Sequence, residues 1–173
     1  MTVTGVRVEL PSNTPIVLLR EQAGTRFLPI WVGAVEAMAI TSALEGVTPP
    51  RPLTHDLLAT VIEKLDAEIQ RIVVTELRNN VYYANLILNS HGEEVVVSSR
   101  PSDAIALSVR TGAPVFASST VLEEASIEFQ DEDGNAEFSD TVEQFREMLQ
   151  NVTIDDFIEP DEPDSEDPDS NDA

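Results

Sequence analysis

Apolar and polar residues alternate along three short segments near the N-terminus, at residues 3–10, 16–21 and 26–32. Such alternation is typical of strands with one buried face, because successive side chains of a strand point to opposite sides. From residue 33 to residue 44 the apolar positions fit a helix instead, and Gly46 with the pair Pro49-Pro50 ends it. The N-terminal part therefore predicts three strands followed by a helix.

A second helix is predicted after Pro52 and extends to about residue 65. Its apolar side chains recur at helical spacing on one face, so we expect that face to pack on the core. These side chains are Leu57, Leu58, Val61, Ile62 and Leu65.

Three more strands are predicted at residues 69–77, 81–88 and 94–98. The sequences between them, Asn79-Asn80 and Ser90-His91-Gly92, are typical of tight turns. We therefore expect these strands to form a meander.

A third helix is predicted after Pro101, ending at Gly112, and a short strand follows at residues 114–117. Helices and strands thus alternate in a mixed order along the chain. This order predicts an α+β fold, in which one or more mixed β-sheets pack with three main helices.

The C-terminal part differs in composition from the rest. Residues 1–120 hold nine basic and twelve acidic side chains, a net charge of −3, whereas residues 121–173 hold one and twenty, a net charge of −19. After Pro160 the terminal alanine is the only hydrophobic residue, so burial cannot offset the loss of chain entropy. The expected divisions are a domain at 1–120, an acidic extension with a weak helix (141–149) at 121–159, and a disordered acidic tail at 160–173.

Several classes of protein are disfavoured by what the sequence lacks. No apolar run approaches the ~20 residues that cross a bilayer, and no secretory signal pattern opens the chain, so a cytoplasmic protein without membrane contact is expected. Because there is no cysteine, a metal would bind carboxylate or imidazole, which favours Mg²⁺ or Mn²⁺. No P-loop, dinucleotide-binding or serine-hydrolase motif occurs, and no organic cofactor is expected.

The first candidate for chemistry is the sequence RPLTHD at residues 51–56, where the second helix begins. Thr54 can cap this helix, and Asp56 can interact favourably with the positive end of its dipole. His55 can act as a base, an acid or a metal ligand because its ordinary pKa is ~6.5. His91, by contrast, lies in a predicted turn and is expected to be solvated.

The second candidate is the sequence RPSD at residues 100–103, where the third helix begins in the same manner. Arg100 precedes the helix, and Ser102 and Asp103 lie in its first turn. If the two helix starts converge, their free N–H groups and the two preceding arginines, Arg100 and Arg51, would bind an anion. Alternatively, these arginines pair with the aspartates as buried structural salt bridges, which is equally compatible with the sequence.

Three segments resemble the bacterial bifunctional nuclease domain family: PIWVGAVEAMAI (29–40), RPLTHDLL (51–58) and SSRPSDAIALSVRTGAPVF (98–116). The resemblance is close over about residues 1–120 and looser over residues 145–157. It implies a compact α+β domain that cleaves DNA and RNA and is often oligomeric, with a homodimer favoured. The polar residues at the family's motif positions are Glu36, Arg51, Thr54, His55, Asp56, Arg100, Ser102 and Asp103.

Two functions fit these residues. The first is metal-assisted hydrolysis of phosphodiester bonds in nucleic acid, in which His55 moves a proton and the arginines bind phosphate. Its catalytic residues would be His55, Asp56 and Asp103, its substrate-binding residues Arg51, Thr54, Arg100 and Ser102, and its metal ligands Glu36, Asp56 and Asp103. The second is a non-catalytic module that binds an anion or a partner at the same place, with a regulatory acidic tail. The scarcity of basic residues favours the second function.

Overall fold

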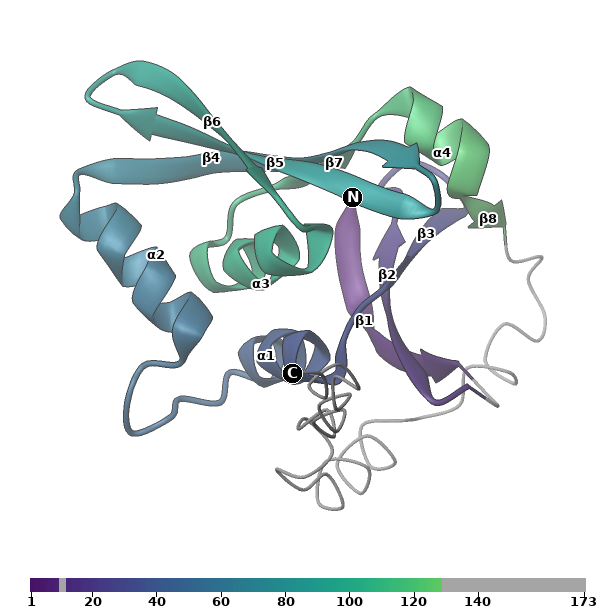
Figure 1. Ribbon diagram of the computed structural model, residues 1–173, viewed down its shortest axis with the longest axis horizontal. Helices are drawn as coiled ribbons and strands as arrows, with labels where there is room; N and C mark the ends of the chain where they lie inside the picture. Colours follow the sequence, from purple (N-terminus) through teal and green to yellow (C-terminus); the bar gives the residue numbers. More distant parts are fainter. Residues whose placement is uncertain (10–11, 129–173) are drawn as a thin grey trace, which may run out of the picture.

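The protein has two four-stranded β-sheets and four helices in the part of the chain that the computed structural model describes, residues 1–9 and 12–128 (Figure 1). The antiparallel first sheet contains, in spatial order, β1 (Thr2–Glu9), β2 (Thr14–Arg20), β3 (Arg26–Trp31) and β8 (Ile127–Glu128). The second sheet contains β6 (Glu93–Ser99), β5 (Val81–Ser90), β4 (Ala67–Arg78) and β7 (Val115–Ala117). The helices are α1 (Ala34–Leu44), α2 (Thr54–Lys64), α3 (Pro101–Thr111) and α4 (Ser119–Ala125). The predicted α+β fold is confirmed.

The predicted meander is β4–β5–β6, whose neighbouring strands are antiparallel. Both residues of each connecting turn have positive φ: Asn79 and Asn80 at 51° and 61°, and His91 and Gly92 at 53° and 86°. Turns of this kind match the right-handed twist of the strands they join, and asparagine and glycine adopt them most readily. β7 then pairs parallel with β4, which makes the second sheet mixed.

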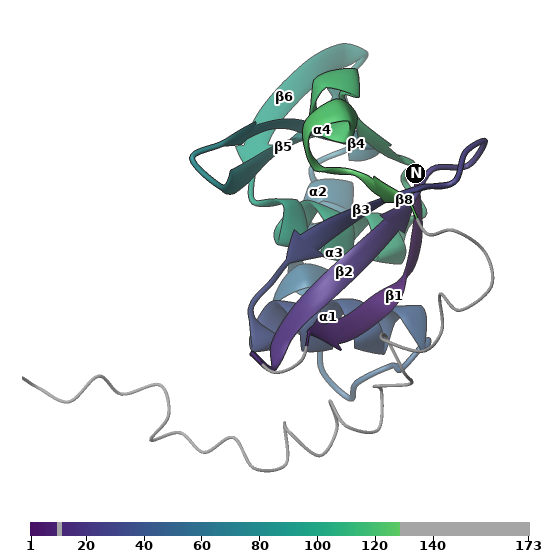
Figure 2. The same cartoon turned by 90° about the vertical axis from the view of Figure 1, so that its right-hand side faces the viewer.

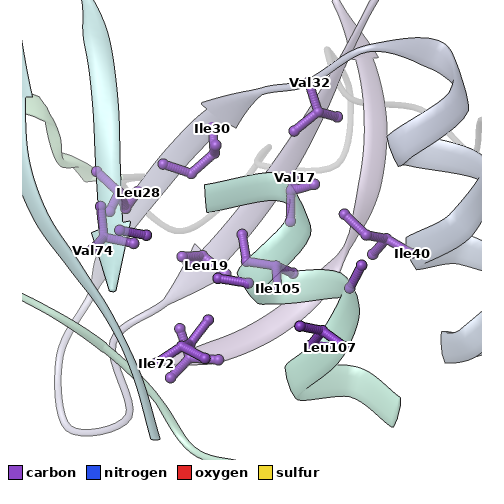
Figure 3. Close-up of a cluster of buried hydrophobic side chains, with 14 of the residues drawn as sticks. Val17, Leu19, Leu28, Ile30, Val32, Ile40, Ile72, Val74, Ile105 and Leu107 are labelled. Atoms are coloured by element: carbon purple, nitrogen blue, oxygen red, sulfur yellow. The ribbon is translucent and has the colours of Figure 1, made fainter. Parts of the chain in front are cut away.

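Helix α3 lies between the two sheets and carries the centre of the core (Figures 1 and 3). Its Ile105 and Leu107 are completely buried, and Figure 3 shows Ile105 beside Val17 and Leu19 of β2. Pro101 begins the helix and Gly112, with φ of 75°, ends it in the left-handed conformation, as the sequence predicts. Helix α1 packs against α3 on the side away from the second sheet, below α3 in Figures 1 and 2.

The predicted burial of the apolar face of α2 is wrong for most of that face. Of its five large apolar side chains only Ile62 packs against the core, together with Ala59. The other four are 40–66% exposed: Leu57, Leu58, Val61 and Leu65. The reason is that α3 already fills the space beneath the second sheet, so α2 lies at its flank and contacts α3 and β4 along one narrow stripe. A helical pattern shows which residues share a face but not what covers that face.

Helix α4 and β8 extend the folded part of the chain beyond residue 120, and the sequence pattern did not predict this helix. Val121 and Leu122 are buried, and the Ser118 hydroxyl caps the helix by accepting from the Val121 N–H group. The predicted helix at 141–149 and the predicted tail at 160–173 lie outside the described residues. None of the described helices combines the length and the hydropathy needed to cross a bilayer.

Candidate functional site

The first turns of α2 and α3 meet, as the sequence analysis required for a shared site. His55, the second residue of α2, lies with Nε2 3.0 Å from Oδ1 of Asp103, the third residue of α3. The His55 side chain is 12% exposed and that of Asp103 is 30% exposed. A largely buried imidazole thus forms a hydrogen bond with a carboxylate near the surface.

Arg100 joins this pair to a third helix. Its Nε donates to Asp103 Oδ2 at 2.8 Å, and its Nη2 lies 2.7 Å from Oε1 of Glu36, in the first turn of α1. The Arg100 side chain is 64% exposed, whereas that of Glu36 is 18% exposed. Glu36, His55, Arg100 and Asp103 therefore form one connected set, which we call the His55 cluster.

Charge interactions within the cluster keep its ion pair charged. Burial acts to raise the pKa of Asp103, but hydrogen bonds from Arg100 and His55 outweigh it, and the pKa is lowered. The pKa of Arg100 is raised by its hydrogen bonds to Asp103 and then to Glu36. Asp103 is thus a carboxylate at neutral pH, able to orient the His55 ring, and Arg100 presents a charged guanidinium to solvent.

A pocket of about 500 Å³ opens over the cluster. It is bordered by the start of α1, the start of α2 and the start of α3, so free N–H groups of helix first turns are close to it. Beyond the cluster it is lined by Val35, Met38, Ala39, Pro52, Leu53 and Thr54. The pocket therefore combines an ionic part, formed by two carboxylates, one guanidinium and an imidazole, with an apolar wall.

A second, smaller pocket of about 270 Å³ also borders Arg100. Trp31, Tyr82 and the 7% exposed Ser102 contribute to its lining. Ser102 was expected at the same site as His55, but among these two pockets it lines only the smaller one. Arg100 is the residue shared by both.

Asp56 and Arg51, two further residues predicted for the site, are not part of the cluster. Both oxygen atoms of Asp56 are engaged elsewhere: Oδ1 accepts from Arg110 Nε at 2.5 Å and Oδ2 from the Leu53 N–H group at 2.9 Å. The hydrogen bond from Arg110, followed by that from Leu53, lowers the pKa of Asp56. Arg51 is exposed and forms no hydrogen bond or ion pair with any described residue.

The cap of α2 also differs from the prediction. Thr54 was expected to cap the helix, but the N-cap position is Leu53, and the side chain that binds its N–H group is Asp56. Thr54 is exposed and lines the larger pocket.

Arg110, the partner of Asp56, was missed by the sequence analysis. It lies in the last turn of α3, where a basic residue stabilises the negative end of the helix dipole. A basic residue at that place therefore does not by itself indicate a further partner. One signal could have found it: Arg110 follows Asp103 by seven residues, so both lie on the same face of the helix. One face of α3 therefore binds two neighbouring residues of the first turn of α2: Asp103 binds His55, and Arg110 binds Asp56.

The predicted metal ligands Glu36, Asp56 and Asp103 do not gather around one point. Within the described residues, no group of three or more acidic or histidine side chains is arranged to hold a metal ion. Glu36 and Asp103 are both paired with Arg100, and Asp56 faces Arg110. This donor set does not fit a three-ligand Mg²⁺ or Mn²⁺ site in its present arrangement.

Comparison with known proteins gives the family. The sequence profile of the bifunctional nuclease domain matches residues 17–130, which is more than half of the chain and includes the whole His55 cluster. The chain belongs to the bifunctional nuclease domain family.

Relatives of the chain occur in bacteria and plants. An uncharacterized protein of Mycobacterium tuberculosis is 42% identical over 159 residues, covering 90% of this chain and 95% of that protein. Two proteins of rice (Oryza sativa) named bifunctional nuclease 1 and bifunctional nuclease 2 are 28% and 29% identical over 103 and 112 residues. These matches cover 58% and 61% of this chain but only 31% and 34% of the rice proteins. The shared part is thus about one third of each plant nuclease.

Proposed function

We propose that the protein hydrolyses phosphodiester bonds in DNA and RNA at the His55 cluster. The observation that carries the proposal is the hydrogen bond between His55 and Asp103 beside the exposed guanidinium of Arg100. Membership of the bifunctional nuclease domain family supports a nuclease-like role. The named nuclease activity of the rice relatives supports the same reaction class.

In the proposed reaction, Arg100 and the helix first turns bind the phosphate. Nε and Nη2 of Arg100 bind Asp103 and Glu36, so its Nη1 is the nitrogen that can donate to a phosphate oxygen atom. The first N–H groups of α2 and α3 also lack partners within their helices. Negative charge on the nonbridging oxygen atoms increases as water adds to phosphorus. Donors fixed in place before the reaction stabilise that charge at no cost of reorganisation.

His55 would move the proton. Its neutral ring takes a proton from the attacking water as oxygen bonds to phosphorus, and the resulting imidazolium gives a proton to the leaving sugar oxygen as the P–O bond breaks. Asp103 holds the ring in one orientation and stabilises the imidazolium through the 3.0 Å hydrogen bond. The products are a phosphomonoester and a free hydroxyl, and the enzyme returns to its starting protonation state.

The test is an assay of DNA and RNA cleavage by homogeneous protein, with and without EDTA and with Mg²⁺ or Mn²⁺ added back. We expect cleavage of both nucleic acids, and at least roughly a 100-fold loss in Asp103→Asn, whose amide orients the histidine ring differently. Because no three-donor metal site is present among the described residues, the steps above use only the protein's side chains. An Mg²⁺ or Mn²⁺ requirement would appear as a loss in EDTA that the ion restores.

Equal cleavage by the wild-type protein and Asp103→Asn would reject the assignment of the cluster. Absence of any cleavage would favour the alternative of a non-catalytic anion-binding module. The scarcity of basic residues, ten against 32 acidic ones, supports that alternative, because an enzyme that acts on a polyanion is expected to have a positive groove at its site. Inorganic phosphate or a short oligonucleotide would then bind to the wild-type protein without turnover.

The proposal includes self-association as a homodimer through the exposed face of α2. Four large apolar side chains on one helix face are unusual on a monomer surface and typical of an interaction site. Two-fold symmetry would place the same apolar surface on both sides of the interface.

Light scattering with size-exclusion chromatography tests this association. We expect the wild-type protein to have the mass of a dimer and the double variant Leu57→Glu/Val61→Glu to have that of a monomer, since burying two carboxylates opposes association. Thr60→Glu, on another side of the same helix, is the control and should stay dimeric. A monomeric wild-type protein would contradict the dimer.

A further inference from the structure

Arg110 forms a second connection between α2 and α3, away from the pocket over the His55 cluster. Its Nε donates to Asp56 Oδ1 at 2.5 Å, and its Nη1 donates to the Ala106 carbonyl at 2.9 Å. Only 10% of its side chain is exposed. A guanidinium that is buried and bound through two nitrogen atoms has a fixed orientation.

Asp56 connects the fixed guanidinium of Arg110 to the start of α2. One of its oxygen atoms binds Arg110, and the other binds the N–H group of Leu53, the N-cap residue. The carboxylate therefore ties the backbone at the helix start to the guanidinium on α3. His55 lies between Leu53 and Asp56 in the chain, within the segment that is held.

The two connections from α2 contact α3 at two positions along the axis of α3. His55 contacts Asp103 and Asp56 contacts Arg110, and these two α3 residues are seven positions, or roughly 10 Å along the helix axis, apart. A single contact would allow the first turn of α2 to pivot about it. Two contacts at separate points fix both the position and the rotation of that turn.

We propose that Arg110 is a positioning residue that holds His55 against Asp103 by way of Asp56. This role rests on the proposed function of the His55 cluster, although its structural part can be measured without any activity. Arg110 does not line the pocket over the cluster, so it acts through other residues and not on the substrate. A purely stabilising role would lower the free energy of unfolding but leave the His55 ring in place in folded molecules.

Nuclear magnetic resonance of the histidine rings separates these two roles. The chain has two histidines, and His91, in the exposed turn between β5 and β6, serves as an internal reference. At one fixed pH, we expect the ring ¹⁵N and ¹H signals of His55 to shift in Arg110→Gln and those of His91 to stay unchanged. Arg71→Gln is the matched control, because Arg71 also forms an ion pair, with Glu94, but on the second sheet.

Kinetics provide the second measurement. We expect Arg110→Gln to lower kcat by up to roughly 100-fold with little change in KM, because a misplaced catalytic group slows the reaction without removing a substrate contact. Arg110→Lys keeps the charge but not the fork of donors, so it should restore part of kcat and part of the His55 signal position. Arg71→Gln should match the wild type in both measurements.

The outcomes distinguish this proposal from the proposed function. Unchanged His55 signals in folded Arg110→Gln would overturn the positioning role, whatever the activity. Shifted His55 signals in a protein whose wild type cleaves no nucleic acid would support the positioning role and reject the nuclease. If Arg110→Gln does not fold, Asp56→Asn breaks the same ion pair from the other side and must shift His55 in the same way for the proposal to stand.

Discussion

Replacing His55 by glutamine is expected to lower the kcat for nucleic-acid cleavage by about 100- to 10,000-fold, the usual contribution of a positioned acid and base. Glutamine keeps a side-chain amide that can bind Asp103, so the start of α2 should remain in place. What the amide lacks is a group that accepts and releases a proton near neutral pH. The measurement is the initial rate of cleavage of one DNA and one RNA substrate at saturating concentration.

His91→Gln is the matched control for this substitution. His91 is exposed in the turn between β5 and β6, and no hydrogen bond or ion pair joins its side chain to another described residue. Its replacement should leave kcat and KM at their wild-type values. Similar losses in the two variants would show that the effect does not come from the His55 cluster.

The sequence named all four residues of the His55 cluster as candidates, because helix starts have local signals. Pro101 marks the start of α3. Once that start is known, Arg100 must precede the helix, and Ser102 and Asp103 must lie in its first turn. Likewise, His55 has to lie in the first turn of α2. The meeting of His55 with Asp103 was an assumption, because 48 residues separate them and only tertiary packing brings the two helix starts together.

The sequence failed where competition between partners decides the outcome. Asp56 is adjacent to His55 and has the chemistry of a metal ligand, but Arg110, 54 residues away, binds it instead. Arg51 and Arg100 precede helices in similar motifs, yet only Arg100 has carboxylates of two helices within reach. Composition and spacing state what a side chain can bind, whereas the fold selects which partner it meets.

The fold shows the same division between local and tertiary information. Alternation, turn sequences and helix ends are local, and they predicted β4–β5–β6 and both ends of α3. Burial is not local, so the apolar face of α2 was assigned to the core although α3 occupies that place. The missed helix α4 has few residues and no distinctive periodicity, and its burial of Val121 and Leu122 depends on the sheets it packs against.

Replacing Ile105 by alanine is expected to lower the free energy of unfolding by about 2–5 kcal/mol, a large part of the roughly 5–15 kcal/mol of a typical domain. Ile105 is completely buried in α3 between the two sheets, where its neighbours cannot all move to fill the space it leaves (Figure 3). Alanine favours the helix slightly more than isoleucine does, so the loss comes from packing and not from the backbone. Urea denaturation should show a lower midpoint with an unchanged slope.

Leu44→Ala is the control for this substitution, because Leu44 is also helical and apolar but is 41% exposed at the end of α1. It should cost about 1 kcal/mol or less, since much of its surface is already in water. An equal cost for the two substitutions would mean that α3 is not the centre of the core. Asp103 and Arg110 are both on α3, so the weakened core of Ile105→Ala should also lower the temperature at which cleavage is lost. At lower temperature, the kcat of folded Ile105→Ala should change far less than that of His55→Gln.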